Sequence, residues 1–370
     1  MNQKIDIIEV VYKDPRGMEA GGLENYALNI KRLLGNKNFN IIFAYSYTGN
    51  INDNSNKKDI RIKISRIPIF KKLIFNIKLY NYLKKQKWKG VIHINGDDGV
   101  FCTRLKHVKT VFTLHGSSLQ YASILIKTNP FNFIDMLSST VSGLMELYAY
   151  LTADSVTGVS RYCLDFMGKF KNRSYNIIPP CIEKTQKVVN KNKYRATFGF
   201  EKDQLLCIFV GGDAKRKGLD TAINAIGKIN SNKIKLLIVG PTKKPKINKN
   251  CKFFGRVDKK TLERLYSISD ILFFPSKYEG FPAVISESMS FGVVPLVYNK
   301  KPFNEIANNE NSFLVDYTDE FSYTLSELIY NRKDLLKRRV VCKNEAKRFL
   351  AKNLFSEYSK IFKRYKESKF

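Results

Sequence analysis

Two glutamates, Glu279 and Glu287, flank a predicted helix start in the second half of the chain. The preceding run ILFFPS (271–276) is mostly apolar and predicts a buried parallel strand. Pro282 suits the first helical position, and Gly292 suits the end of that helix. The helix N-terminus then presents backbone N–H groups and a positive dipole end at the carboxyl edge of a sheet. Two carboxylates there can hold sugar hydroxyls, whereas a lone glutamate is more simply a solvated surface charge.

A basic loop follows a second strand-like run, LLCIFV (205–210). Gly212 lies just beyond this run, and Arg216 and Lys217 precede a glycine and a predicted helix. Guanidinium and ammonium groups at a carboxyl edge suit a diphosphate leaving group, whose developing charge must be stabilised. Taken alone, the same sequence is more commonly a solvated basic turn.

The elements around these loops alternate between short β-branched runs and helical stretches, which is typical of parallel α/β layers. Runs such as 5–11, 90–95 and 109–114 predict strands in the first half, and the scheme restarts at residue 205. The charged, aperiodic segment 184–195 is the predicted interdomain linker. We expect two Rossmann-like, doubly wound α/β domains that face each other across a cleft, with ligands at the carboxyl ends of the strands.

The string from Pro275 to Val297 resembles the signature of the retaining family 4 glycosyltransferases, a GT-B family within the glycosyl transferases group 1. In that signature a glutamate followed by G-F-P or a similar turn precedes a second glutamate after seven residues, and Glu279 and Glu287 match it. The resemblance implies that Glu279 holds donor-sugar hydroxyls and that Glu287 holds the ribose. It also assigns a set of loop residues to the donor site, namely Gly280, Phe281, Pro282 and Ala283.

The same resemblance makes Arg216 and Lys217 the diphosphate pair, and Gly212 stands where many members have a further arginine. It places Arg256 and Val257, in the F-x-G-x-V turn, beside the nucleobase. In the first half, it implies that the glycine-rich loop with Gly21 and Gly22 approaches the donor phosphate or the acceptor. His115, at the end of the strand 109–114, corresponds to an active-site histidine near the sugar.

These matches imply a metal-independent retaining transferase that moves a hexose-type sugar from a nucleotide diphosphate sugar, such as a UDP- or GDP-sugar, to a lipid-linked or glycan acceptor. No D-x-D motif suits a donor-bridging Mg²⁺, so we expect neither a metal nor a cofactor. Two alternatives stay open. A GT-B epimerase would use the same donor site, and a nucleic-acid-binding protein would explain the net charge of +31, although no nucleic-acid-binding motif is present and we expect no nucleic-acid partner.

We expect residues 1–183 to form an acceptor-binding domain and residues 184–350 a nucleotide-sugar-binding domain. The helix at 351–370 is expected to cross back to the first domain. Six scattered cysteines without a C-x-x-C pair favour a cytoplasmic compartment. The longest apolar stretch, 131–153, contains Asp135 and Glu146 and predicts a packed helix rather than a membrane span.

Residues 68–90 contain seven lysines and no acidic residue. Apolar residues recur there at roughly helical spacing, which is typical of a helix lying on a membrane surface, although an ordinary core-facing stripe fits equally well. The stripe comprises Leu73, Ile74, Ile77, Tyr80 and Leu83 or Trp88. Because the net charge of +31 attracts anionic lipid, we predict peripheral attachment to the inner face of the membrane.

Overall fold

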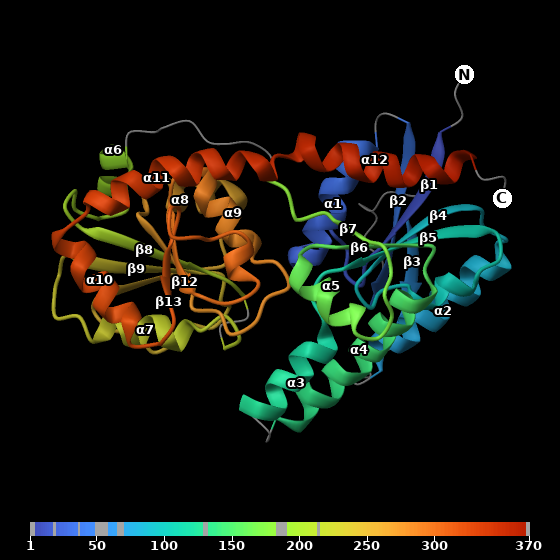
Figure 1. The fold of residues 1–370 in the computed structure, drawn as a ribbon, viewed down its shortest axis with the longest axis horizontal. Helices are drawn as coiled ribbons and strands as arrows, with labels where there is room; N and C mark the ends of the chain where they lie inside the picture. Colours follow the sequence, from blue (N-terminus) through green and yellow to red (C-terminus); the bar gives the residue numbers. More distant parts are fainter. Residues whose placement is uncertain are drawn as a thin grey trace. The chain divides into compact units, whose positions relative to one another are not determined.

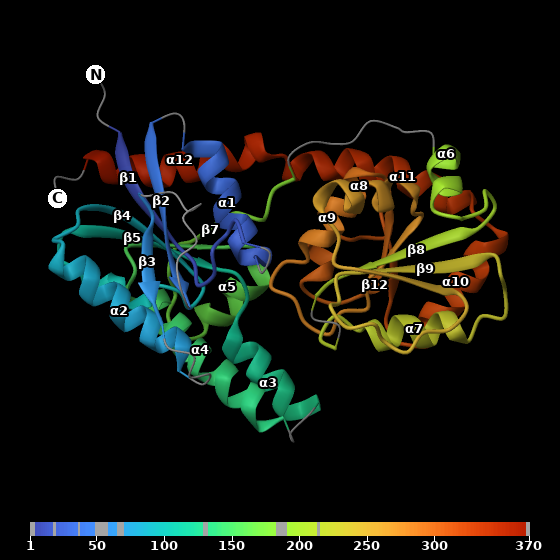
Figure 2. The same ribbon diagram turned by 180° about the vertical axis from the view of Figure 1, so that it is seen from behind.

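The structure is a computed structural model that describes residues 4–17, 20–35, 38–48, 58–64, 70–128, 132–182, 191–212 and 215–367. The chain divides into two compact units. Unit 1 comprises Met1–Cys181 and Ala351–Phe370, and unit 2 comprises Ile182–Leu350. Each unit contains a parallel sheet layered with helices, as Figures 1 and 2 show, which confirms the doubly wound α/β prediction.

The sheet of unit 1 has the strand order β3-β2-β1-β4-β5-β6-β7, and each described pair is parallel. The central strand β4 is buried along its whole length, including the polar residues His93 and Asn95. The strands are β1 (Ile5–Val10), β2 (Phe39–Tyr47), β3 (Ile60–Lys63), β4 (Gly90–Asn95), β5 (Val108–Leu114), β6 (Ser155–Gly158) and β7 (Asn176–Ile177).

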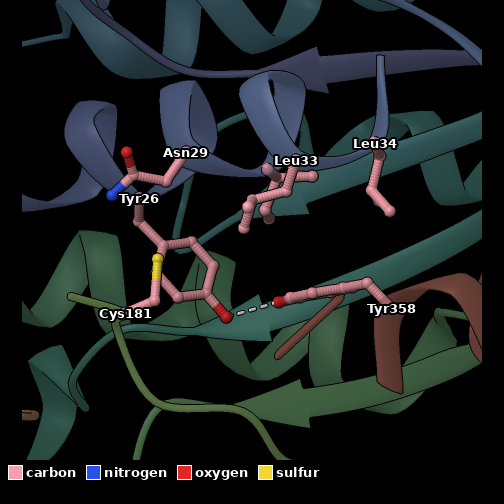
Figure 3. Close-up of a pocket in the computed structure, with 7 residues that line it drawn as sticks. Tyr26, Asn29, Leu33, Leu34, Cys181 and Tyr358 are labelled. Carbon is pink, nitrogen blue, oxygen red and sulfur yellow. Dashed lines mark hydrogen bonds between the residues drawn. The ribbon is translucent and has the colours of Figure 1, made fainter. Parts of the chain in front are cut away.

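Helices cover this sheet, and the last helix of the chain, α12, belongs to unit 1. Tyr358 of α12 lies in hydrogen-bond contact with Tyr26 of α1 at 2.5 Å, and Tyr26 donates to the carbonyl of Ile178 at 2.8 Å. A small apolar pocket beside this contact is lined partly by Cys181 (Figure 3). The helices are α1 (Gly22–Leu34), α2 (Lys71–Lys85), the 3-10 turn η1 (Val100–Arg104), α3 (Ser118–Thr128), α4 (Phe133–Thr152), α5 (Arg161–Gly168) and α12 (Ala351–Glu367).

The sheet of unit 2 has the order β10-β9-β8-β11-β12-β13 and is parallel in each described pair. Its strands are β8 (Leu205–Val210), β9 (Ile234–Val239), β10 (Cys251–Gly255), β11 (Ile271–Phe273), β12 (Val294–Tyr298) and β13 (Phe313–Val315). Its helices are α6 (Lys191–Thr197), α7 (Leu219–Gly227), α8 (Lys259–Ile268), α9 (Ala283–Ser290), η2 (Phe303–Glu305), α10 (Glu320–Tyr330), α11 (Lys333–Ala346) and η3 (Lys347–Phe349).

Each sheet contains a point where the chain reverses the direction in which it adds strands. In unit 2, β8, β9 and β10 extend the sheet to one side, and β11, β12 and β13 extend it to the other. In unit 1 the corresponding reversal lies between β1 and β4. The loops after such neighbouring strands separate at the carboxyl edge and leave room for a ligand, so each unit offers one such position.

Local elements differ from the sequence-based expectations in two places. Helix α9 begins at Ala283, with Pro282 as its N-cap, and Gly292 follows its end with φ of 72°. The predicted linker 184–195 lies partly outside the described residues, but Lys191–Thr197 forms helix α6. Arg195 and Lys191 hold this helix in place through ion pairs of 2.6 and 2.7 Å with Asp270. Among the described residues, no helix is long and apolar enough to cross a membrane.

Candidate active site

The basic loop of unit 2 runs from the end of β8 to the start of α7, and two glycines let it pack closely. Gly218 has φ of 76°, and a Cβ atom there would lie 2.1 Å from the carbonyl oxygen of Pro275. A Cβ atom on Gly211 would lie 2.1 Å from Cδ of Lys217. Gly218 therefore lets the loops after β8 and β11 approach more closely than a side chain would allow, and Gly211 leaves room for the Lys217 side chain within the basic loop.

Glu279, in the loop after β11, forms ion pairs with the two cationic side chains of the basic loop. Its Oε1 lies 3.3 Å from Nη1 of Arg216 and 3.2 Å from Nζ of Lys217. The hydroxyl of Ser276 donates to the same oxygen at 3.0 Å. Glu279 is only 7% exposed, so this carboxylate is not the solvated surface charge of the simpler interpretation.

Backbone contacts fix the two loops against each other. Arg216 donates from Nη1 to the carbonyl of Tyr278 at 2.6 Å, and the backbone N–H of Lys277 donates to the carbonyl of Arg216 at 2.9 Å. The ammonium of Lys217 lies 4.9 Å from the ring centroid of Phe274, a cation–π distance. The switch point of unit 2 thus holds two positioned cations and one carboxylate, which can bind an anion and a hydroxyl side by side.

Glu287 lies on α9 and is half-buried. Burial raises its pKa to about 7, against the opposing effects of a hydrogen bond from Tyr266 and the charge of Lys217. The Tyr266 hydroxyl donates to Oε2 of Glu287 at 3.4 Å, and its ring stacks on Phe291 with centroids 5.4 Å apart. A carboxyl with a perturbed pKa beside a cationic loop is a feature of ligand sites.

The remaining donor-site predictions in unit 2 fall on loops at the same sheet edge. Gly212 is exposed at the end of β8. Arg256 is exposed just after β10, and Val257 is half-buried against the core. Phe281 packs edge-on against Phe349 with centroids 5.7 Å apart. The other assigned residues, Gly280, Pro282 and Ala283, connect Glu279 to α9. The contacts of these residues with a donor stay predictions.

His115 of unit 1 follows β5, as expected from the sequence. Its Nε2 lies 2.9 Å from Oδ1 of Asn95, and its ring meets Tyr26 edge-on at 4.7 Å. Burial, helped by the nearby His93, lowers the pKa of His115 to about 3. The imidazole is therefore neutral at physiological pH, where it can exchange hydrogen bonds with a substrate but does not carry a positive charge.

Gly21 and Gly22 lie between β1 and α1 and are exposed. The N–H of Gly21 donates to Oε2 of Glu24 at 2.8 Å, which caps the helix. Neither glycine adopts a left-handed φ, and a Cβ atom on Gly22 would meet nothing within 4 Å. The backbone conformation does not itself require glycine here, so close approach of a substrate stays a prediction.

A buried polar cluster at the switch point of unit 1 was missed from the sequence. Lys72 of α2 pairs with Asp97 and lies 3.4 Å from Oδ1 of Asp98. The N–H of Tyr12 donates to Oδ2 of Asp98 at 2.8 Å, and burial raises the pKa of Asp98 to about 7. Two acidic residues directly after the buried strand GVIHIN were the available signal. Within the described part of the chain, no group of three or more His, Cys, Asp or Glu side chains is arranged to hold a metal.

Comparison with known proteins shows what the chain is similar to. Residues 190–349 match the model of the glycosyl transferases group 1. The O-antigen biosynthesis glycosyltransferase WclY of Escherichia coli is 24% identical over 218 residues, which cover 56% of this chain and 58% of WclY. The chain spans only 34% to 58% of the length of the curated relatives that it matches.

Two solved structures share the fold over almost the whole chain. Sucrose-phosphate synthase from Thermosynechococcus elongatus has a TM-score of 0.83 at 16% identity and covers 98% of this chain and 99% of its own. HepE of Anabaena, in complex with UDP-glucose, has a TM-score of 0.74 at 13% identity and covers 97% of this chain and 100% of its own. Residues 190–349 thus resemble the glycosyl transferases group 1, and the fold of the chain is that of the GT-B glycosyltransferases.

Proposed function

We propose that this protein is a retaining glycosyltransferase that moves a hexose-type sugar from a nucleotide diphosphate sugar to a lipid-linked or glycan acceptor. The observation that carries the proposal is the cluster of Arg216, Lys217 and Glu279 at the switch point of unit 2. Two cations suit a diphosphate, and a buried carboxylate beside them suits the hydroxyls of the attached sugar.

The cluster suggests how the leaving group is stabilised. When the bond between the anomeric carbon and the diphosphate breaks, negative charge grows on the departing oxygens. Arg216 and Lys217, already fixed by Tyr278 and Phe274, need little reorganisation to meet that charge. Glu279 meanwhile offers its second oxygen, Oε2, to a hydroxyl of the sugar. In this proposal the two side chains supply the positive charge, and activity does not depend on an added divalent metal.

The donor class follows from the second glutamate and from a structural neighbour. Glu287 and Tyr266 form a hydroxyl-binding pair on α9 and α8, which fits a ribose. HepE, which shares the fold, was solved with UDP-glucose, and this supports a UDP-sugar among the candidate donors. WclY acts in O-antigen biosynthesis, which supports a glycan or lipid-linked glycan acceptor.

We place the enzyme at the cytoplasmic face of the inner membrane, attached peripherally. Of the predicted stripe on α2, Leu83 is buried, while Leu73, Ile74 and Tyr80 are half-buried and contribute to packing. Ile77 is exposed. The exposed lysines of the same helix, Lys78, Lys84 and Lys85, support an attraction to anionic headgroups.

The proposal is tested by incubating the protein with UDP-, GDP- and ADP-sugars and a mixture of glycan and lipid-linked acceptors. We expect release of the nucleoside diphosphate and a product whose anomeric configuration, read by NMR, equals that of the donor. Lys217→Gln should lose this activity, whereas Lys228→Gln, at an exposed lysine that caps the end of α7, should retain it. A free epimerised sugar without transfer would support the epimerase instead, and a product of opposite configuration would contradict retention.

A further inference from the structure

The hairpin of α3 and α4 in unit 1 carries a cluster of exposed apolar side chains at its tip. Phe133 is 69% exposed and Ile134 is 79% exposed, and three further residues exceed one half. In Figures 1 and 2 this end of the hairpin extends away from the sheet of unit 1. We call these residues the hairpin patch: Ile126, Phe133, Ile134, Leu137 and Leu144. Exposed apolar clusters of this kind usually mark an interaction site.

The patch is a regular surface of a well-packed hairpin. On α4, Leu137, Leu144 and the 38% exposed Leu151 recur at intervals of seven residues, so they follow one face of the helix. Met145 and Ala149 on the other face are buried. Across the hairpin, a Cβ atom on Gly143 would lie 2.5 Å from the backbone nitrogen of Leu119, so the two helices are in close contact.

The base of the hairpin is anchored by a buried carboxyl group. Glu146 of α4 accepts from the backbone N–H of Ser118 at 2.8 Å and from its hydroxyl at 2.7 Å. Ser118 begins α3 three residues after His115, so the hairpin is joined directly to the loop that carries the predicted active-site histidine. The patch is therefore held at a fixed place relative to that loop.

The neighbouring surface is basic. The turn η1 contacts both α2 and α4, so the three elements form one continuous layer on unit 1. Thr152 of α4 donates to Thr103 of η1 at 2.9 Å, and Phe101 meets Tyr148 edge-on at 6.0 Å. Helix α2 of this layer also carries the exposed lysines Lys78, Lys84 and Lys85, together with the exposed apolar residues Ile77 and Tyr82.

We propose that the hairpin patch inserts into the headgroup and acyl-chain boundary of an anionic lipid bilayer, while the lysines of α2 contact the headgroups. A mixture of protruding apolar and basic side chains fits such a surface, because insertion and electrostatic attraction act together. A second copy of the chain fits less well, because a two-fold contact would bring the basic α2 surface near its own copy. This inference rests on the peripheral attachment that forms part of the proposed function, and it does not depend on any sugar chemistry.

The test first compares vesicle binding of the wild type with that of a patch variant and a control variant. The patch variant carries Phe133→Ser, Ile134→Ser and Leu137→Ser, all at exposed positions, so its fold should persist. The control variant carries Tyr323→Ser and Tyr330→Ser, which are 70% and 81% exposed on α10 of unit 2. Co-sedimentation uses vesicles of phosphatidylcholine that contain roughly one third phosphatidylglycerol, across a salt series.

We expect the wild type and the control variant to bind equally, with binding that weakens but persists at high salt. The patch variant should bind at least about tenfold more weakly at every salt concentration, because the inserted apolar area is lost. Lys78→Gln with Lys85→Gln should instead reduce mainly the salt-dependent part. Equal binding of the patch variant and the wild type would overturn the proposal.

A depth measurement separates insertion from adsorption. Brominated lipids should quench the fluorescence of the tryptophan introduced by Ile134→Trp but not that of the tryptophan introduced by Tyr330→Trp. The native Trp88 contributes the same background fluorescence to both variants. Absence of quenching at position 134 would overturn insertion. If the wild type instead formed a concentration-dependent dimer and did not bind vesicles, and the patch variant stayed monomeric, the patch would be a contact with a second copy of the chain. Because these readouts need no turnover, a failed transferase assay would leave the result for the hairpin unaffected.

Discussion

Glu279→Gln isolates the charge of the central carboxylate, because it keeps the size of the side chain. In the structure, Ser276, Arg216 and Lys217 all contact Oε1. We assign the other oxygen, Oε2, to a donor-sugar hydroxyl. One hydrogen bond to a charged group contributes about 1.5–3 kcal/mol. Since ~1.4 kcal/mol is a factor of ten in rate, kcat/KM should fall by about 10- to 150-fold.

The same substitution should also lower stability, because it leaves two cations facing each other without a counter-charge. Arg216 and Lys217 are 23% and 16% exposed at their side chains, so water screens part of this repulsion. We therefore expect a loss of about 1–2 kcal/mol, well below the cost of breaking a fully buried pair. For a unit of this size that corresponds to a fall in Tm of about 2–8 °C, and the variant should remain folded at assay temperature.

The assay measures kcat/KM with each accepted donor, and circular dichroism confirms folding. Glu310→Gln is the matched control, since it makes the same chemical change at an exposed loop position of unit 2. Activity of Glu279→Gln within about twofold of the Glu310→Gln value would refute the assignment, because a group that binds the reacting sugar cannot lose its charge at so little cost.

Four further predictions concern the same unit. Lys217→Gln should lower kcat by about 100-fold through lost stabilisation of the leaving diphosphate, whereas EDTA should leave wild-type kcat unchanged; strict dependence on Mg²⁺ or Mn²⁺ would contradict this. The pKa of about 7 at Glu287 predicts that the donor KM falls as pH rises through 7, because ribose hydroxyls donate to the ionised carboxylate, and Glu287→Gln should abolish that trend. Because this pKa is raised above the ordinary 4.5, ionisation opposes folding, so Glu287→Gln should gain stability over the wild type as pH rises from 4.5 to about 7, and the difference should level off above that, measured by denaturant titration. Gly218→Ala should lower Tm more than Gly199→Ala, because their φ angles of 76° and 74° impose similar strain but only Gly218 would clash with a carbonyl oxygen; equal losses of Tm would show that the close approach of the two loops is not rigid.

Much of the fold could be predicted because each strand and helix carries its own local pattern. The run GVIHIN forms β4 as predicted, and it is buried at every position although it contains His93 and Asn95. Gly292 ends α9 in the left-handed conformation for which glycine is suited. The sequence predicted a linker where α6 begins, because the contacts that stabilise α6 come from residues distant in the sequence. Arg195 bonds to Asp270 and to the carbonyl of Ile268, residues more than 70 positions away.

The candidate site shows the same division between local and distant information. That Glu279 lies beside Arg216 and Lys217 agrees with the sequence, because each lies in a loop after a buried strand and parallel topology brings such loops to one edge. Their supporting contacts could not be identified this way. Tyr266 bonds to Glu287 from another helix, and the carboxyl of Asp98 bonds to the backbone of a residue 86 positions away. Spacing within one segment carries no information about such pairs.

Apolar periodicity indicates which face of a helix avoids water in the isolated segment, but not what covers that face in the folded chain. The stripe on α2 was weighed as a membrane surface against ordinary core, and the structure divides it, with Leu83 buried and Ile77 exposed. The stretch 131–153 was expected to be a packed helix, and α4 is packed on one face only. The charges of Asp135 and Glu146 excluded a membrane span, but they did not indicate that Ile134 and Leu137 would protrude. Where a helix leaves the globular body, the layers beneath it decide its exposure, and those layers come from segments distant in the sequence.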